Sequence, residues 1–363
     1  MNLTRIILAG GFLGSGKTML LWQAAKMLTE QGLRVGLITN DQAPQLVDSA
    51  LLTHNHLKVE EVSGSCFCCN FNGFTDAIRH LRSDVQADVI IAEPVGSCAD
   101  LSATILQPLK EYWNTELRVS PLSVLTDPRR LQSILDGGNA GLHPDAAYIV
   151  KKQMEEADVI LINNAGLLSA DEMQKLIQHT ASTFPAATIY PISALKGTGI
   201  RQWLDVVMKS NEAGKRLLDI NYDTYAHGEA VLGWLNGTIL LHGKTTDWNQ
   251  FAKQLLTSLS EQFDKAHLSV CHVKVILENG DQYVMGNLTG KAETLSMRGD
   301  AGTSGDAKLV INARVETSPE ALDQMVNGAI DGLTGADYQK DVEAWKYLQP
   351  GRPNPTHRFR EVV

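Results

Sequence analysis

The chain has 363 residues, of which 44% are hydrophobic and 20% charged, so it is long enough to fold as two domains with separate cores. A net charge of -9 argues against unspecific binding to nucleic acid or anionic membranes and favours the attraction of metal cations. No basic stretch precedes a long apolar segment near the N-terminus, so we expect no signal peptide, no membrane span and a cytoplasmic protein.

The most specific motif is a phosphate-binding loop, GFLGSGKT, at residues 11–18. It follows an apolar run at residues 6–9 and precedes a helical pattern at residues 19–28, which is the context that such a loop requires. Backbone N–H groups would converge on the phosphates, while Lys17 would reach the β- and γ-phosphates and Thr18 would ligate Mg²⁺. A glycine-rich turn without function would leave the Lys-Thr pair unexplained. The nucleotide contacts predicted in this loop are Gly11, Gly14, Ser15, Gly16, Lys17 and Thr18.

Up to about residue 210, short β-branched apolar runs alternate with longer helical patterns. This alternation predicts an α/β domain at residues 1–210, a P-loop NTPase with a mostly parallel sheet and helices on both faces. The predicted strands are residues 5–9, 34–39, 58–62, 88–92, 118–126, 159–163 and 188–192. Further helices are predicted at residues 75–81, 101–113, 146–157, 171–183 and 200–209.

Two strand ends carry acids that fit a nucleotide site. The strand at residues 88–92 leads into Glu93, and Gly96 follows three residues later. The carboxylate can hold Mg²⁺ or its water, and the glycine N–H can contact the γ-phosphate, so hydrolysis would release this segment. Asp41, which ends the second strand, is another magnesium-side or water-orienting candidate, with a turn-starting Asn-Asp pair as the alternative. The catalytic candidates are therefore Lys17, Asp41 and Glu93.

Three of the five cysteines, Cys66, Cys68 and Cys69, lie within four positions. The odd total and the missing signal peptide argue against a disulfide framework. Thiolates at this spacing can converge on Zn²⁺, Co²⁺ or Ni²⁺ and leave one position open for a metal that is handed on. A redox dithiol and inert buried cysteines are the alternatives. Besides water or a partner's side chain, the fourth ligand could be His54, His56, Glu60, Glu61 or Cys98.

The two remaining cysteines have different surroundings. Cys98 lies two residues after Gly96, within the segment expected to move on hydrolysis. It could couple metal binding to nucleotide state, or it could be a small buried apolar residue. Cys271 and His272 are adjacent on a predicted strand and therefore face opposite sides, so we expect both to be structural.

Base recognition is expected after the strand at residues 159–163, where guanine-specific enzymes carry Asn-Lys-x-Asp. This chain reads NNAG at residues 163–166 and lacks the aspartate that would accept two hydrogen bonds from guanine. A buried donor left unpaired costs about 1–3 kcal/mol, so the sequence leaves GTP and ATP both open. Asn163 remains a candidate base contact, as do the main-chain groups of Ser193 and Ala194.

Beyond a polar linker at residues 211–228 the pattern changes to strand, helix, two or three strands and helix. This order predicts a ferredoxin-like α+β domain at residues 229–333, followed by an extended tail at residues 334–363. The strands of this domain are expected at residues 229–241, 268–277, 283–288 and 308–315, and its helices at residues 247–263 and 319–330.

In combination, GGFLGSGKT, GSCFCC, EPVG and the ferredoxin-like domain resemble the CobW-type metallochaperone GTPases, SIMIBI-class relatives of the urease and hydrogenase nickel-insertion GTPases. The resemblance implies a nucleotide-gated carrier of Zn²⁺ or Co²⁺ that loads a client metalloprotein or a cofactor pathway. By position it implies that Lys17 and Thr18 contact phosphate and magnesium, that Glu93 and Gly96 form the switch, and that the three clustered cysteines bind the metal.

Two features depart from that family. Residues 40–43 read NDQA where the family usually has Asn-Glu-Phe-Gly, and the Asn-Lys-x-Asp element is broken. The segments at residues 222–226 and 232–236 resemble a subgroup associated with cobalamin, that is, with corrinoid-dependent methyl transfer. This second resemblance implies a corrinoid protein as partner.

The leading interpretation is an NTP hydrolase, most simply a GTPase, whose nucleotide state controls the cysteine site and whose intrinsic rate is slow. One rival is an adaptor for a corrinoid or metalloenzyme client, in which the cysteines only stabilise a loop. The other is a small-molecule kinase. The expected partners are the nucleotide and the client, without nucleic acid or membrane, and a homodimer is one expected assembly.

Overall fold

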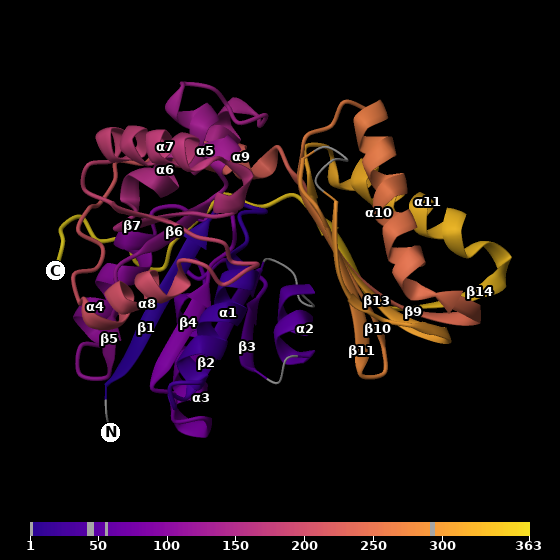
Figure 1. Ribbon diagram of the computed structural model, residues 1–363, viewed down its shortest axis with the longest axis horizontal. Coiled ribbons are helices and arrows are strands. Elements are labelled where there is room, and N and C mark those ends of the chain that lie inside the picture. Colours follow the sequence, from indigo (N-terminus) through magenta and orange to yellow (C-terminus); the bar gives the residue numbers. More distant parts are fainter. Residues whose placement is uncertain (1–2, 42–46, 55–56, 291–294) are drawn as a thin grey trace. The chain divides into compact units, whose positions relative to one another are not determined.

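The computed structural model describes residues 3–41, 47–54, 57–290 and 295–363 (Figure 1). The chain forms two compact units. The first contains the described residues of three stretches, 3–41, 57–228 and 352–363. The second contains residues 229–351 together with helix α2 (Val47–His54), which is contributed from the N-terminal part of the chain.

The first unit is built on a parallel sheet with the order β3-β2-β4-β1-β6-β7-β8, and β5 pairs with β1 beside this path. Its central strands are buried along their whole length, because helices flank the sheet (Figure 1). The predicted α/β fold class is therefore confirmed. The strands are β1 (Thr4–Gly11), β2 (Val35–Asp41), β3 (Lys58–Ser63), β4 (Val89–Glu93), β5 (Leu117–Val119), β6 (Ser123–Thr126), β7 (Val159–Ile162) and β8 (Thr188–Pro191).

The prediction of one strand at residues 118–126 was wrong. β5 and β6 are separate strands that pair with different parts of β1, because Pro121 between them has no N–H to donate to a ladder. The helix predicted at residues 101–113 is a π-helical turn (Ser102–Leu106) followed by α4. The α-helices of this unit are α1 (Lys17–Thr29), α3 (Phe71–Asp84), α4 (Gln107–Tyr112), α5 (Pro128–Leu135), α6 (Pro144–Glu156), α7 (Ala170–Thr183), α8 (Ile200–Lys209) and α9 (Tyr222–Ala230).

The predicted linker at residues 211–228 is not irregular throughout, because its last part begins α9. Asn221 starts this helix, since its side-chain oxygen accepts hydrogen bonds from the N–H groups of Asp223 and Thr224. The Tyr225 hydroxyl accepts a hydrogen bond from the N–H of Ala99, at 3.1 Å, in the segment that follows β4. The end of the expected linker therefore packs against the site described below.

The second unit is an antiparallel sheet with the order β12-β11-β10-β13-β9-β14. Helices α10 and α11 pack with one face of this sheet, and α2 packs on Ile276 and Val310 of the other face. Without the β11–β12 hairpin, the strand order is that of a ferredoxin-like fold. The elements are β9 (Gly233–Asp247), α10 (Trp248–Lys265), β10 (Val270–Asn279), β11 (Gln282–Leu288), β12 (Ser296–Asp300), β13 (Thr303–Val315), α11 (Pro319–Thr334) and β14 (Tyr338–Leu348).

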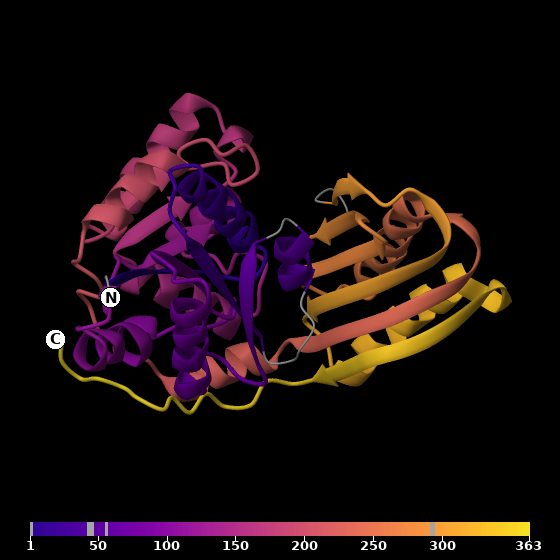
Figure 2. The ribbon, with the colours of Figure 1, turned by 90° about the horizontal axis from the view of Figure 1, so that it is seen from below.

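The predicted end of this domain at residue 333 and the extended tail from residue 334 need correction. β14 pairs with β9 along its length and belongs to the sheet. Its sequence is rich in charged residues because it is an edge strand with an exposed face, so it looked like a surface tail. Only residues 352–363 form an extended segment, and this yellow segment runs along the first unit (Figure 2). None of the helices in the described ranges is long and apolar enough to cross a membrane.

Candidate functional site

The phosphate-binding loop connects β1 to α1. Gly11 ends the strand with a φ of 128°, and Gly16 caps the helix with a φ of 97°. These positive φ angles favour glycine at both ends of the loop, and the loop leads directly into the N-terminus of α1, which attracts anions. A Cβ at Gly16 would lie 2.3 Å from the side-chain nitrogen of Asn163. Gly14 and Ser15 lie between them, and the Ser15 N–H donates to the carbonyl of Phe12.

The side chains of Lys17, Thr18 and Glu93 meet next to this loop. Lys17 Nζ donates to the carbonyl of Gly11 at 2.9 Å and lies 3.7 Å from Glu93 Oε1. The Thr18 hydroxyl donates to Glu93 Oε2 at 3.1 Å. All three side chains are buried, and the hydroxyl and carboxylate oxygens are the hard donors that Mg²⁺ prefers. The residues fit an Mg²⁺ ion, which would neutralise phosphate charge there.

The segment after β4 lies directly against the phosphate loop. A Cβ at Gly96 would lie 2.9 Å from the backbone nitrogen of Leu13, so only glycine allows this approach. Sequence reasoning missed Arg130, whose guanidinium donates to the carbonyl of Leu13 at 2.8 Å and lies over the ring of Phe12. Arg130 reaches the loop from α5, a helix that the sequence pattern did not predict.

The end of β2 connects the nucleotide side of the unit to the cysteine loop. Asn40 donates to the carbonyls of Val62 and Ser65 at 2.8 Å each, and its oxygen accepts the N–H of Phe67 at 2.9 Å. Asp41 is buried and lies two residues beyond Thr39, the partner of Glu93 in the sheet. Gln42 and Ala43, where the sequence departs from the family, lie outside the described residues.

The side chain of Asn163 links the phosphate loop to the loop that contains Ala194. Its nitrogen donates to the carbonyl of Ser15 at 2.8 Å, and its oxygen accepts the N–H of Ala194 at 2.9 Å. The backbone N–H of Ser193 donates to Thr198, and its hydroxyl accepts the N–H of Lys196. The base-site candidates are therefore brought together and tied to the phosphate loop.

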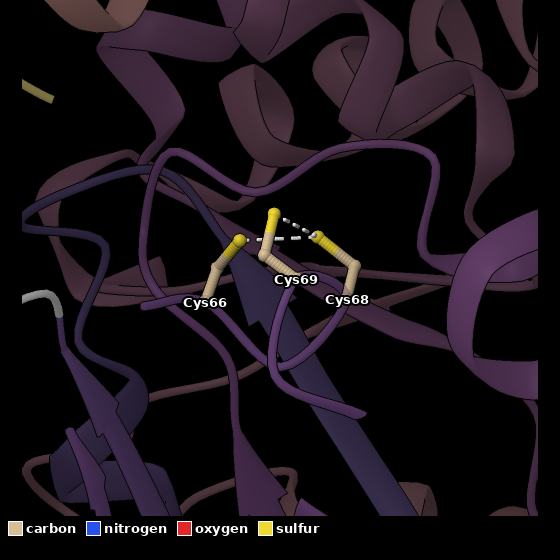
Figure 3. Close-up of side chains that lie close together, drawn as sticks. All are labelled: Cys66, Cys68 and Cys69. Atoms are coloured by element: carbon tan, nitrogen blue, oxygen red, sulfur yellow. Dashed lines mark hydrogen bonds between the residues drawn. The ribbon is translucent and has the colours of Figure 1, made fainter. Parts of the chain in front are cut away.

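The cysteine loop runs from β3 to α3 and holds three sulfur atoms on one side (Figure 3). Cys66 and Cys68 have their sulfur atoms 3.1 Å apart, and those of Cys68 and Cys69 are 3.8 Å apart. Phe67 points away into the core, where it stacks on Phe74 with 4.2 Å between ring centroids. Phe67 lies between Cys66 and Cys68 in sequence, so its burial anchors the loop next to these two thiols.

The thiols differ in acidity because they share hydrogen bonds. The neighbouring thiols, Cys68 first, stabilise a thiolate at Cys66 and hold its pKa well below the ordinary value. The same contact with Cys66 raises the pKa of Cys68 well above the ordinary value and raises the pKa of Cys69 to about 11. A cysteine that ionises more readily than usual, with two further thiols beside it, favours a soft or borderline cation, which displaces the thiol protons on binding.

Residues 352–363 cover the half-buried side of this cluster. The N–H of Asn354 donates to the Cys69 sulfur at 3.2 Å, and the N–H of Thr356 donates to the carbonyl of Cys68 at 2.8 Å. Four residues along the chain from Asn354, Arg358 bonds the buried carboxylate of Asp100 at 2.6 Å. This C-terminal segment therefore joins the cysteine loop to the segment after β4.

The other candidate ligands are placed as follows. Cys98 is buried beside the cluster, whereas Cys271 and His272 are buried in β10 of the second unit. Glu60 and Glu61 lie in β3, where the Glu60 carboxylate is 3.6 Å from a ring nitrogen of His80. His56 and the side chain of His54 lie outside the described residues.

A second group of three metal-binding side chains exists among the described residues, at His143, Asp145 and His227. The Asp145 carboxylate accepts from His227 at 2.5 Å, and His143 caps α6 by accepting the N–H of Asp145. A cation there would face the positive N-terminus of α6 and would have to displace this cap. We interpret the group as an ion pair that fastens α9 to α6.

Glu156 lies fully buried next to the segment that follows β4. One of its oxygens accepts the N–H of Ser102 at 3.1 Å, and the other has no hydrogen-bond partner within the described part of the chain. Burial raises the pKa of this carboxyl well above its ordinary value of 4.5, and the nearby Asp100 and Asp158 act in the same direction. Because the folded state holds the proton more tightly than the unfolded chain, stability falls as the pH rises above that ordinary value.

Glu156→Gln should therefore raise the free energy of unfolding of the first unit at about pH 8, because the amide is neutral in the folded and the unfolded chain alike. The gain should shrink toward zero at about pH 4, where the acid is neutral in both states. Urea unfolding at the two pH values measures it. The neighbouring Glu155→Gln, which removes ion pairs with Lys152 at 2.8 Å and with Lys151 at 4.0 Å, is the control. A gain of equal size at both pH values would contradict the expectation.

Comparison with known proteins assigns the chain to a family. Residues 5–191, just over half of the chain, match the family described as the CobW/HypB/UreG nucleotide-binding domain. The chain is 26% identical over 201 residues to zinc-regulated GTPase metalloprotein activator 1 of Dictyostelium discoideum, covering 47% of this chain and 42% of that protein. It is 26% identical over 200 residues to the zinc chaperone YjiA of Escherichia coli K12, covering 53% of this chain and 58% of that protein.

The chain thus matches about half the length of these curated relatives. Among solved structures, Zn(II)-bound YjiA GTPase from E. coli is similar over 92% of this chain and 99% of that one, with 15% identity and a TM-score of 0.37. HypB from Helicobacter pylori in complex with nickel covers 58% of this chain and 87% of its own, with 15% identity and a TM-score of 0.40. From the family match, the chain belongs to the CobW/HypB/UreG nucleotide-binding family.

Proposed function

We propose that this protein is a nucleotide-dependent metallochaperone that carries Zn²⁺ or Co²⁺ as cargo on Cys66, Cys68 and Cys69. The observation that carries the proposal is the convergence of three thiols on one loop, with every sulfur within 4.8 Å of the others. Thiolate ligands suit these borderline cations. The names of the curated relatives, a zinc chaperone and a zinc-regulated metalloprotein activator, support zinc in particular.

The metal and nucleotide sites share structural elements, which supports control of one by the other. Asn40, at the end of β2, binds three backbone groups around the cysteine loop. It is adjacent to Asp41, which we propose to act with Glu93 on the attacking water and on Mg²⁺. A nucleotide that moves the end of β2 changes the geometry of the loop, and by linkage the metal changes nucleotide affinity by the same factor.

Titration of Co²⁺ into the full-length chain tests the metal site. We expect sulfur-to-cobalt charge-transfer absorption that saturates at about one equivalent, as one cluster of thiolates predicts. The triple variant Cys66→Ser, Cys68→Ser, Cys69→Ser should lose this absorption, and Cys271→Ser, which changes a buried cysteine of the second unit, should keep it. Wild-type protein without charge-transfer bands would refute metal carriage and favour a purely structural loop.

The nucleotide is proposed to be GTP or ATP with Mg²⁺, bound by Gly11 to Thr18 and sensed by Glu93 and Gly96. Asn163 already bonds Ser15 and Ala194, so we propose that it shapes the base site and that the base is held mainly by main-chain groups. Calorimetry with GTP and ATP analogues in the presence of Mg²⁺ tests this. Comparable affinities support relaxed recognition, whereas binding of GTP alone would require a carboxylate substitute elsewhere.

The client is proposed to be a metalloprotein or a corrinoid protein. The second unit, whose ferredoxin-like sheet carries α2 from the N-terminal part of the chain, is the proposed recognition domain. Helix α2 is fastened there by the N–H of Val47, which donates to Asn312, and by a 2.6 Å ion pair between Asp48 and Lys274. A segment that follows Asp41 in sequence is thus part of the proposed client-binding unit.

A further inference from the structure

Cys98 lies against the cysteine cluster, although it comes from a different segment of the chain. Its side chain is 1% exposed and lies within hydrogen-bonding reach of the Cys66 and Cys68 thiols. Those two sulfurs also belong to the group that includes Cys69. Cys98 therefore adjoins the two buried members of the cluster, although its sulfur stands outside the group in which all sulfurs are within 4.8 Å of one another.

The backbone around Cys98 is fixed by hydrogen bonds from neighbouring elements. The side-chain nitrogen of Gln153 donates to the carbonyls of Gly96 and Cys98 at 2.9 and 2.8 Å. Tyr225 accepts the N–H of Ala99. Asp100 adopts a φ of 65°, which costs a residue with a side chain about 1–2 kcal/mol and persists only when its surroundings hold it.

The surroundings that hold Asp100 include the segment that covers the cluster. Its buried carboxylate accepts hydrogen bonds from the Tyr222 hydroxyl at 2.8 Å and from Arg358 at 2.6 Å. Four residues before Arg358, Asn354 binds the Cys69 sulfur. The same C-terminal segment therefore bonds both the turn that carries Cys98 and the loop that carries the other three cysteines.

We propose that Cys98 supplies a fourth thiolate, so that the cargo ion is held by Cys66, Cys68, Cys69 and Cys98; this rests on the proposed metal carriage. Each thiol gives up its proton as its sulfur bonds the ion. In a tetrahedral site with metal–sulfur bonds of about 2.3 Å, the sulfurs lie roughly 3.8 Å apart. The Cys68 and Cys69 sulfurs already have this spacing, and Cys66 and Cys68 need to separate by less than about 1 Å.

This ligand set makes the coordination number depend on the nucleotide site. Cys98 follows Gly96, which lies against the phosphate loop, and Glu93, which bonds Thr18. With Cys98 in place the ion has four sulfur ligands and no open position. When the segment moves, the ion is left with three sulfurs and one position that a client's ligand can occupy. The bound ion would thus be either fully coordinated or open to a client's ligand, depending on the position of the segment after β4, which senses the nucleotide.

X-ray absorption on the wild-type full-length protein loaded with one equivalent of Zn²⁺ counts the ligands directly. Four sulfur neighbours support the proposal, and three sulfurs with one nitrogen or oxygen overturn it. This measurement needs no variant, so it decides even if Cys98 is required for folding. A sample without sulfur neighbours would instead refute the proposed metal carriage itself.

Two matched variants provide a second test by Co²⁺ titration. Cys98→Ser should lose about a quarter of the charge-transfer intensity. It should also lower the affinity for Co²⁺ at least about 10-fold, because even a residue that only hydrogen-bonds a metal ligand changes metal affinity about 10–100-fold. Cys271→Ser, an equally buried cysteine in the other unit, should change neither quantity. If Cys98→Ser binds Co²⁺ like wild type while the triple cysteine variant does not, Cys98 is not a ligand and metal carriage stands.

Discussion

Replacing Lys17 with alanine should weaken nucleotide binding at least about 100-fold and abolish measurable hydrolysis. The ammonium is buried, donates to the carbonyl of Gly11 and lies 3.7 Å from Glu93, so it occupies the side of the loop where phosphate oxygens are expected. Each hydrogen bond to a charged group contributes about 1.5–3 kcal/mol, and the lysine would make two with the β- and γ-phosphates. Calorimetry for affinity and phosphate release for hydrolysis measure the two effects.

Lys26→Ala is the matched control, because Lys26 belongs to the same helix and its ammonium lies over the ring of Trp22. An exposed cation–π contact is worth about 0.5–1 kcal/mol, and Lys26 does not contact the loop, so nucleotide affinity should stay unchanged. Nucleotide binding of Lys17→Ala at wild-type affinity would show that the loop does not bind phosphate in the expected way.

Gly11→Ala should lower the free energy of unfolding of the first unit by about 2–5 kcal/mol, the sum of overpacking and left-handed backbone strain. An added Cβ would lie 2.3 Å from the carbonyl oxygen of Leu125 and 2.9 Å from its nitrogen. Both atoms belong to the backbone of β6, a central strand that cannot shift without breaking its pairing with β1. Urea unfolding followed by tryptophan fluorescence measures the loss.

Gly137→Ala separates the two contributions. Gly137 also has a positive φ, of 80°, but an added Cβ would meet no heavy atom within 4 Å. Its alanine variant should therefore lose only the about 1–2 kcal/mol of folding stability that left-handed backbone strain costs. Equal losses at the two positions would show that the close approach of β1 and β6 is not what requires glycine at Gly11.

The elements whose sequence signals come from local physics were predictable. The phosphate loop stands out because Gly, Lys and Thr occur at fixed spacing between an apolar strand and a helix. The buried parallel strands β2 and β4 stand out as apolar runs. The three clustered cysteines were found because their spacing alone brings the thiols together.

The rest depended on contacts that leave no local trace. Helix α9 is short and has no apolar stripe. It is stabilised instead by Asn221, which accepts hydrogen bonds at its start, and by the hydroxyl groups of Tyr222 and Tyr225, which bond the segment after β4. β14 is a charged edge strand that only its pairing with β9 defines. The position of Cys98 beside Cys66 depends on Gln153, Tyr225 and the C-terminal segment. The sequence could suggest Cys98 as a fourth metal ligand, but it could not show that Cys98 lies beside Cys66.

The contact between Asn354 and Cys69 also has a consequence for the order in which the protein is made. The two residues are 285 positions apart. At translation rates of about 5–20 residues per second, the cysteine loop is synthesised roughly 15–60 s before the residues that cover it. During that interval the nascent loop lacks the N–H groups of Asn354 and Thr356 and the Arg358 bond that steadies the Cys98 turn. An ion or oxidant that reaches these thiols within that interval therefore meets a site that still lacks its C-terminal cover.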